Sequence, residues 1–105
     1  MGERTPHVQD ADFNEVVAML SQVIAERKSA DVQESYTASL LQGKLDKPLQ
    51  KLVEEATEVA LAAKDNDHDH IRYEAADLFY HLLVVLERCG VTLSELAGEL
   101  LARHK

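Results

Sequence analysis

Five acidic residues fall into two short groups whose spacing matches neighbouring turns of a helix. The first group is Glu54, Glu55 and Glu58, and the second is Glu74 and Asp77. Residues three apart lie on one face of a helix, so Glu55 with Glu58 and Glu74 with Asp77 form two carboxylate pairs. Carboxylate oxygens alone suit Mg²⁺ or Mn²⁺ and disfavour zinc, which prefers cysteine and histidine. The spacing therefore predicts a site for a divalent cation, provided that the two helices meet.

The second group lies in a very apolar stretch of the chain. Ten of the twelve residues from 75 to 86 are apolar, and the exceptions are Asp77 and His81. A helix that is apolar on all sides is buried on all sides, so we expect it to pack against other helices and a second subunit. A carboxylate there costs several kcal/mol unless it is paired, protonated or bound to a metal. Asp77 therefore needs a partner, which is a cation, a buried arginine or a capping hydrogen bond.

Each acidic group also has a simpler interpretation. Glutamates such as Glu54, Glu55 and Glu58 most often lie on a solvated helix face. Lys51 precedes Glu55 by four residues, the spacing of an ordinary ion pair on one helix. Four carboxylates that are close together cannot all stay ionised without cations. The two groups taken together therefore favour the metal site over a solvated face.

Two lysines precede the first acidic group by about one and two helical turns. These residues are Lys51 and Lys47. Magnesium sites typically combine a few carboxylates with the phosphates of a substrate, and lysine side chains contact phosphate oxygens. An acidic protein can bind an acidic substrate in this way, because the metal supplies positive charge.

The elements that must position these residues are helices. The apolar periodicity predicts helices over 13–28, 47–64 and 71–88, a short helix around 36–41, and a last helix after Thr92. Asp12 and Thr92 are each followed three residues later by a glutamate, which predicts two capping boxes. Gly43 and Gly90 are suited to end the helices before them. The short polar connection at 65–69 predicts that the two helices around it form an antiparallel hairpin.

We therefore expect an all-α fold of four to five helices, completed by dimerisation. Residues 1–11 are expected to form a flexible tail and residues 12–105 a single domain. Three further features are expected to carry no chemistry. His81 is expected to be a hydrogen-bonded interior residue, the run 67–70 (Asp-His-Asp-His) to be exposed and inert, and Cys89 to be a small packed residue.

Composition narrows the class of protein further. The chain has 105 residues, with 11 basic and 19 acidic side chains and a formal charge of −8. This length fits one domain. The 46% hydrophobic content excludes a disordered chain, and the 29% charged content argues against a membrane protein. The acidic balance disfavours nucleic-acid binding. With no apolar stretch near the start and a single cysteine, we expect a cytoplasmic protein.

The sequence around the acidic groups resembles a known superfamily. Residues 54–58 (EEATE), a gap of fifteen residues and residues 74–77 (EAAD) resemble the EExxE…ExxD signature of the all-α NTP pyrophosphatase, or MazG-like, superfamily. Over residues 13–104 the chain is similar to the phosphoribosyl-ATP pyrophosphohydrolase family. Three positions depart from the usual family pattern: Val53 replaces a glycine, Pro48 replaces an aliphatic residue, and the segment 39–44 differs. The segments that carry the similarity are 26–28 (ERK), 35–37 (SYT), 45–47 (LDK), 54–59 (EEATEV) and 74–83 (EAADLFYHLL).

This resemblance implies a reaction and a set of residue roles. It implies Mg²⁺-dependent hydrolysis of phosphoribosyl-ATP to phosphoribosyl-AMP and pyrophosphate, the second step of histidine biosynthesis, by a homodimer or dimer-based oligomer. Mn²⁺ is expected to substitute for Mg²⁺. Glu54 is implied to support the metal ligands or to orient the attacking water. The implied metal ligands are Glu55, Glu58, Glu74 and Asp77, and the implied substrate contacts are Lys47, Lys51, Ser35, Tyr36 and Thr37.

Two other functions stay open at this point. One is a house-cleaning nucleotide pyrophosphatase of the same fold, which acts on a modified or surplus nucleoside triphosphate. The other is a helical dimerisation module without catalytic activity. The substrate profile separates the first from phosphoribosyl-ATP hydrolysis, and amide substitutions in the acidic groups separate the second.

Overall fold

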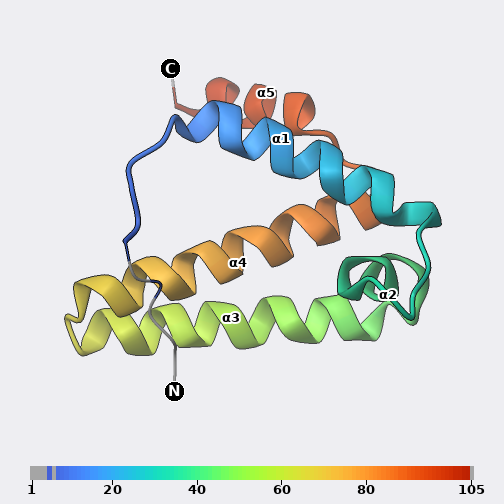
Figure 1. Ribbon diagram of the computed structural model, residues 1–105. Coiled ribbons are helices and arrows are strands. Elements are labelled where there is room, and N and C mark those ends of the chain that lie inside the picture. Colours follow the sequence, from blue (N-terminus) through green and yellow to red (C-terminus); the bar gives the residue numbers. More distant parts are fainter. Residues whose placement is uncertain (1–4, 6, 105) are drawn as a thin grey trace.

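The computed structural model describes residue 5 and residues 7–104, and within them all regular structure is helical. The described residues form five α-helices and one 3₁₀ turn, and the α-helices are labelled in Figure 1. The all-α prediction is confirmed, and the predicted tail over 1–11 lies partly outside the described residues. In chain order the elements are α1 (Phe13–Glu26), η1 (Arg27–Ser29), α2 (Tyr36–Gln42), α3 (Asp46–Lys64), α4 (His68–Cys89) and α5 (Leu93–Arg103).

Helices α3 and α4 form the predicted antiparallel hairpin and run side by side (Figure 1). The turn between them contains Asn66, whose φ of 55° lies in the left-handed region that asparagine tolerates. Asp67 then caps α4, because its side chain accepts a hydrogen bond from the backbone N–H of His70 at 3.3 Å. This cap starts α4 at His68, three residues before the predicted start. The extra turn brings His70 into the helix.

The other helix ends follow the predicted signals. Gly90 ends α4 with a φ of 77°, a conformation that favours glycine. Thr92 and Glu95 form the complete capping box that was predicted for α5. Asp12 caps α1 by accepting a hydrogen bond from the backbone N–H of Glu15 at 2.9 Å, but among the described residues no reciprocal bond from the Glu15 side chain completes the predicted capping box. Gly43 ends α2 at a close approach, since an added Cβ would lie 2.9 Å from a backbone oxygen.

The core lies where α1, α2 and α4 meet. It consists of Ile24 from α1, Leu40 and Leu41 from α2, and Leu83 and Val84 from α4. Truncating a buried aliphatic side chain to alanine typically costs about 2–5 kcal/mol. A side-chain contact of α4 reinforces this packing: the Arg88 guanidinium donates to the backbone carbonyls of residues 40 and 43, at 2.7 and 2.6 Å. The core therefore fixes the short helix α2 against one end of the hairpin.

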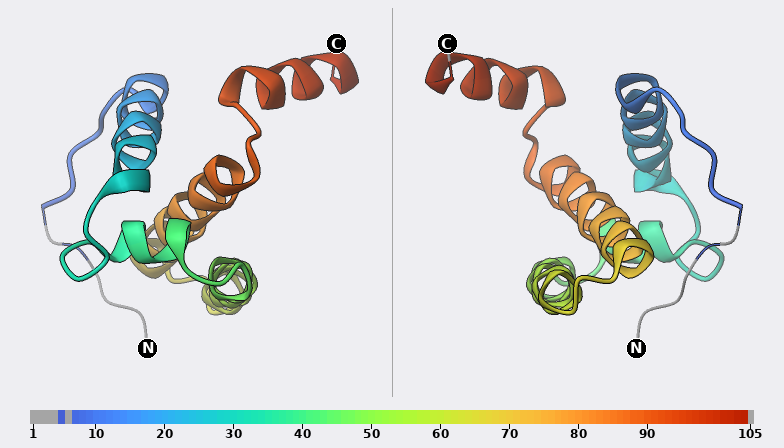
Figure 2. Two further views of the ribbon diagram at one scale, coloured as in Figure 1. Left: turned by 90° about the vertical axis from the view of Figure 1, so that its right-hand side faces the viewer. Right: turned by 90° about the vertical axis from the view of Figure 1, so that its left-hand side faces the viewer.

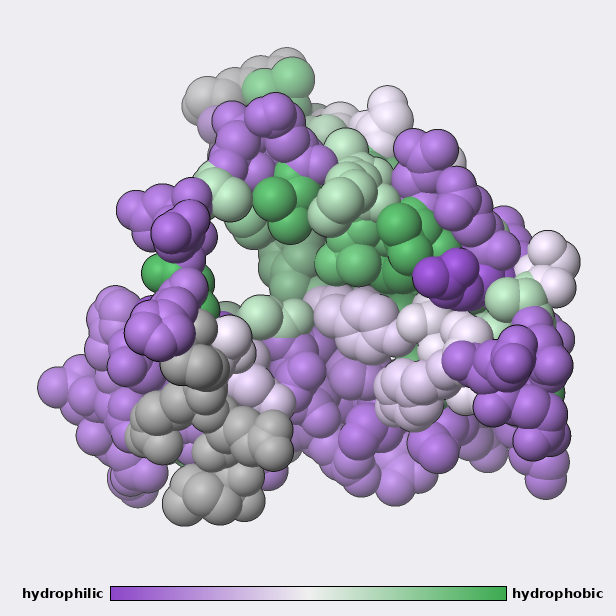
Figure 3. Space-filling view, viewed as in Figure 1, coloured by the Kyte–Doolittle hydropathy of each residue, from purple (hydrophilic) through white to green (hydrophobic). Residues whose placement is uncertain are grey.

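Apolar faces of several helices stay open in the single chain. Ala75, Ala76 and Phe79 of α4 are exposed, so one chain alone does not bury α4 on all sides, and its burial against a second subunit stays a prediction. The ring of Phe79 contacts that of Phe13, which is itself 63% exposed, with ring centroids 5.3 Å apart. Figure 3 shows hydrophobic residues on the surface between α1 and the hairpin. The periodicity identified the apolar residues, but it does not say whether the same chain covers them.

Helix α5 stands away from the hairpin, as Figure 2 shows. None of its residues is buried, and Leu100 and Leu101 are 52% and 68% exposed. Leu93, at its start, packs against the core. A helix of 11 residues is marginal in water without tertiary packing. Among the described residues, no helix combines the length and the hydropathy that a bilayer span requires.

Candidate metal centre

Three of the predicted acidic residues meet between α3 and α4. One carboxylate oxygen from each of Glu55, Glu74 and Asp77 lies within 4.8 Å of the other two. Glu55 and Glu74 are 9% and 4% exposed, and Asp77 is half-buried. Glu55 belongs to α3 and the other two to α4, so the hairpin assembles the group. We call Glu55, Glu74 and Asp77 the carboxylate group.

The chemistry of the carboxylate group fits a hard divalent cation. Burial raises the pKa of Glu55, as does the nearby charge of Asp77, although Lys51 and His81 partly oppose these effects. Three carboxylate oxygens that are partly shielded from solvent are ligands of the kind that Mg²⁺ and Mn²⁺ accept. A cation held among them would also remove the mutual repulsion that raises this pKa.

Glu58 lies one turn beyond Glu55 on α3 and is half-buried. It is not a member of the carboxylate group as the structure places it. Its i, i+3 spacing nevertheless keeps it on the face of α3 that carries Glu55. The predicted role of Glu58 as a metal ligand stays a prediction.

Glu54 occupies the outer side of α3, although it is adjacent to Glu55 in the sequence. It is exposed, and its carboxylate accepts a hydrogen bond from the side-chain amide of Gln50 at 3.0 Å. This hydrogen bond lowers the pKa of Glu54, and the charges of Lys51 and Lys47 lower it further. Glu54 therefore stays ionised at neutral pH without taking part in the buried group.

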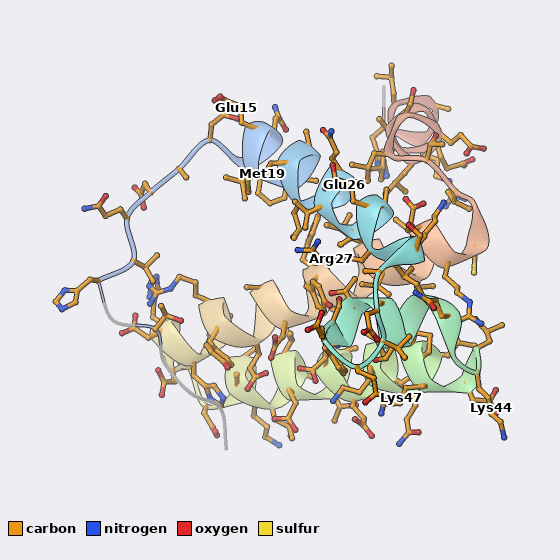
Figure 4. All side chains as sticks on the ribbon, turned by 45° about the vertical axis from the view of Figure 1, so that its right-hand side comes forward. Glu15, Met19, Glu26, Arg27, Lys44 and Lys47 are labelled. Carbon is orange, nitrogen blue, oxygen red and sulfur yellow. The ribbon has the colours of Figure 1, made fainter. Side chains whose placement is uncertain are left out.

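The two predicted phosphate-binding lysines occupy different positions. The ammonium nitrogen of Lys51 lies 3.6 Å from Oε1 of Glu54 and 3.8 Å from Oε2 of Glu55. The predicted ion pair with Glu55 is therefore confirmed. Burial opposes the charge on Lys51, but Tyr36, Glu55 and Glu54 outweigh it and raise the Lys51 pKa above its usual value. Lys47 is exposed and extends from the first turn of α3 (Figure 4).

The three predicted contacts at the start of α2 have distinct surroundings. Ser35 caps α2, since its hydroxyl oxygen accepts from the backbone N–H of Ala38 at 3.1 Å. Thr37 forms a hydrogen bond with the phenol of Tyr80 and so fastens α2 to α4. Tyr36 is 50% exposed, and burial of its remaining surface raises its pKa. Of the three side chains, Tyr36 is the most open to a ligand.

His81 is a hydrogen-bonded interior residue, as predicted. It is 5% exposed, and its Nδ1 lies 2.9 Å from the backbone carbonyl of Asp77. A carbonyl oxygen only accepts, so Nδ1 carries a proton and donates this hydrogen bond, and Nε2 is the second polar atom of the ring. That Nε2 is buried and has no hydrogen-bond partner among the described residues. Buried polar atoms are rarely left without a partner, so this atom is consistent with a ligand or water at the site.

Two predictions outside the acidic groups are wrong. His70 was expected in an exposed, inert turn, but it is 9% exposed and its Nε2 lies 3.0 Å from Oε2 of Glu74. The signal that could have found it is the i, i+4 spacing of these two residues. The expected exposure is confirmed for His68 and Asp69. Cys89 was expected to be packed, but it is exposed at the end of α4.

Comparison with known proteins places the chain in a family. The family model described as "PRA-PH: Phosphoribosyl-ATP pyrophosphohydrolase" matches residues 17–104. The chain is 47% identical over 90 residues to "Phosphoribosyl-ATP pyrophosphatase" of Geobacter metallireducens, covering 86% of this chain and 83% of the relative. It is 43% identical over 91 residues to the protein of the same name from Ruthia magnifica, covering 87% of each.

A third relative is much longer than this chain. It is the "Histidine biosynthesis bifunctional protein HisIE" of Bacillus subtilis, which is 43% identical over 96 residues. The match covers 91% of this chain but 46% of that protein, so the chain spans about half of it. The residues matched by the family model include both acidic groups and all of α2, α3 and α4. The chain therefore belongs to the phosphoribosyl-ATP pyrophosphohydrolase family.

Proposed function

We propose that this chain hydrolyses phosphoribosyl-ATP to phosphoribosyl-AMP and pyrophosphate, with Mg²⁺ as its cofactor, in the histidine pathway of the cytoplasm. The observation that carries the proposal is the carboxylate group, Glu55, Glu74 and Asp77, which lies partly buried between the paired helices of a member of this family. Relatives that match most of this chain bear the name phosphoribosyl-ATP pyrophosphatase, which supports the choice of substrate.

The carboxylate group would hold the cation, and Glu58 would join it from the next turn of α3. When bound there, Mg²⁺ neutralises phosphate charge and lowers the pKa of a bound water. The chain's own residues bind and orient the substrate and the water. Glu54 is the candidate for orienting the attacking water, because it stays ionised beside the site.

Positive charge beside the carboxylate group comes from Lys51, with Lys47 one turn earlier. Lys51 is held between Glu54 and Glu55, so its ammonium group lies at the edge of the site. We propose that both lysines contact phosphate oxygens of the substrate, with Tyr36 beside them. Ser35 and Thr37 then act by holding the start of α2 in place through the contacts described above.

We also propose that two copies of the chain form a homodimer. The supporting observation is the apolar surface left open on α1, α4 and α5, including Phe79 at 37% and Leu101 at 68% exposed. A second copy of the chain would cover all of these apolar faces together. Sedimentation of the wild type is expected to give a dimer, and Phe79→Glu to shift it toward monomer. A monomeric wild type at micromolar concentration would contradict this part of the proposal.

The test is incubation of the purified chain with phosphoribosyl-ATP and Mg²⁺, followed by measurement of pyrophosphate and phosphoribosyl-AMP. We expect equal amounts of both products, and no turnover in excess EDTA or with Asp77→Asn. Hydrolysis of ordinary nucleoside triphosphates without action on phosphoribosyl-ATP would instead support the house-cleaning alternative. Absence of turnover on either substrate with Mg²⁺ or Mn²⁺ would favour the dimerisation module.

A further inference from the structure

A histidine beside the carboxylate group is not explained by the proposed chemistry. His70 lies in the first turn of α4 and contacts Glu74 one turn later, with Nε2 and Oε2 3.0 Å apart. The two side chains are 11% and 5% exposed, so solvent supplies little of their hydrogen bonding. An ionised carboxylate only accepts, so Nε2 of His70 donates to it. This contact is therefore a buried bond from an imidazole N–H to a carboxylate of the group.

The contact has two consequences for Glu74. A glutamate side chain rotates about three bonds, and a hydrogen bond to one carboxylate oxygen restricts this rotation. A buried carboxylate without a donor is also costly, and it tends to take up a proton or turn toward solvent. The bond from His70 therefore keeps the Glu74 carboxylate aimed at the position it shares with Glu55 and Asp77. Groups that hold a metal ligand in this way commonly change metal affinity or activity about 10–100-fold when they are removed.

The cap of α4 holds His70 itself in place. Asp67 accepts from the backbone N–H of His70 at 3.3 Å, which fixes the first turn of the helix. His68, two residues earlier, has a side chain that is 88% exposed. The two histidines therefore share one turn of α4, and the structure directs one of them toward the carboxylate group and the other toward solvent.

We infer that His70 is a positioning residue for the metal centre, which donates a hydrogen bond from Nε2 to Glu74 and so prearranges this ligand for the cation. The inference rests on the proposed function, because it assumes that the carboxylate group binds a divalent cation. It adds a residue that none of the expected ligands or substrate contacts includes. Because the role is to position a ligand, its loss should weaken cation binding, and should raise the concentration of Mg²⁺ needed for activity more than it lowers turnover at saturating Mg²⁺.

The test uses the full chain and Mn²⁺ as the probe, with free Mn²⁺ measured by its electron paramagnetic resonance signal. The variants are His70→Leu, which has no donor, and His70→Gln, whose amide nitrogen can take the place of Nε2. The matched control is His68→Leu in the same turn. We expect His70→Leu to bind Mn²⁺ about 10-fold more weakly, and His70→Gln and His68→Leu to stay close to the wild type. Circular dichroism establishes that each variant is folded.

Each result decides a separate question. A wild type that does not bind Mn²⁺ would refute the proposed metal centre itself. A wild type that binds, together with a folded His70→Leu of equal affinity, would overturn the inference alone. Equal losses in His70→Leu and His70→Gln would also overturn it, because rescue by an uncharged donor is what separates positioning from another role of the imidazole. If His70→Leu does not fold, His70→Asn, whose amide is too short to reach Glu74, takes its place with the same expected loss.

Discussion

The inner and outer faces of α3 place adjacent glutamates in opposite surroundings. Glu55, on the inner face, is 9% exposed and lies among other carboxylates, and burial raises its pKa. Glu54, on the outer face, is exposed and accepts a hydrogen bond from Gln50, which lowers its pKa. Neighbours in the sequence therefore differ in the direction of their pKa shifts because a helix turns by about 100° per residue.

This difference separates two tasks that a hydrolase of this kind must perform. Carboxylates that lie close together and are partly shielded from solvent favour cation binding, since the cation relieves their repulsion. A group that orients water gains from staying ionised and accessible over the working pH range. Lys51 lies between the two faces, within 3.6 Å of Glu54 and 3.8 Å of Glu55, and so links them.

Replacing one carboxylate on each face of α3 is expected to give the largest difference between the two faces. We expect Glu55→Gln and Asp77→Asn to weaken Mn²⁺ binding more than about 100-fold and to abolish pyrophosphate release, because even groups that only support a ligand cost about 10–100-fold. Glu54→Gln should reduce turnover and leave Mn²⁺ binding nearly unchanged. Free Mn²⁺ and released pyrophosphate are measured on the same samples. Equal loss of Mn²⁺ binding in Glu54→Gln and Glu55→Gln would show that the two faces do not differ.

The hairpin and the carboxylate group could be predicted from sequence for a simple reason. The connection between α3 and α4 is short, so it forces antiparallel packing, and periodicity then assigns Glu55, Glu74 and Asp77 to the facing sides. The distance between the Glu58 carboxylate and the carboxylate group could not be predicted, because spacing fixes the face of a helix but not the rotamer of a long side chain.

The environment of His70 was mispredicted for a different reason. The polar run 67–70 is typical of an exposed turn, but Asp67 starts the helix within it, so His70 points inward while His68 stays exposed. The two histidines are two residues apart, about 200° around the helix axis, so they face opposite sides of α4. The exposure of Phe79 in a single chain could not be predicted, because periodicity identifies an apolar face without showing which molecule covers it.

Glu58 lies on the inner face of α3 but outside the carboxylate group. If it is the fourth ligand, Glu58→Gln should weaken Mn²⁺ binding by about 10–100-fold, a smaller loss than for Asp77→Asn, because the three remaining carboxylates stay together. Titration with Mn²⁺ measures the affinity, and circular dichroism checks that the helices persist. Unchanged affinity in Glu58→Gln would limit the ligand set to the three residues that the structure brings together.

Cation binding should also stabilise the fold. This stabilisation should depend on the carboxylate group and not on Glu54. A ligand that binds only the folded state adds about 2.7 kcal/mol of stability at a free concentration of 100 Kd. For a domain of this size each kcal/mol raises Tm by roughly 4–8 °C. We therefore expect millimolar Mg²⁺ to raise the Tm of the wild type and of Glu54→Gln by more than about 5 °C, and that of Asp77→Asn hardly at all. A wild-type Tm that does not respond to Mg²⁺ would argue against the carboxylate group as a cation site.

The smallest expected effect is a difference in how stability without cation depends on pH. The pKa of Glu55 is raised above its ordinary 4.5, so the folded chain binds a proton more tightly than the unfolded chain. The stability from this group is fully present below the ordinary pKa and is lost as pH rises through the raised value. The lowered pKa of Glu54 gives the opposite sign: its contribution is present above the ordinary pKa and is lost as pH falls through the lowered value.

Chemical denaturation in EDTA at a series of pH values measures both contributions. We expect Glu55→Gln to be at least as stable as the wild type at neutral pH, since the amide carries no charge to repel Asp77, and to lose this advantage as the pH falls toward 4.5. Glu54→Gln should be slightly less stable than the wild type at neutral pH, and the difference should vanish in acid. If both variants shift the pH profile in the same direction, the opposite electrostatics of the two faces of α3 would not describe the folded chain.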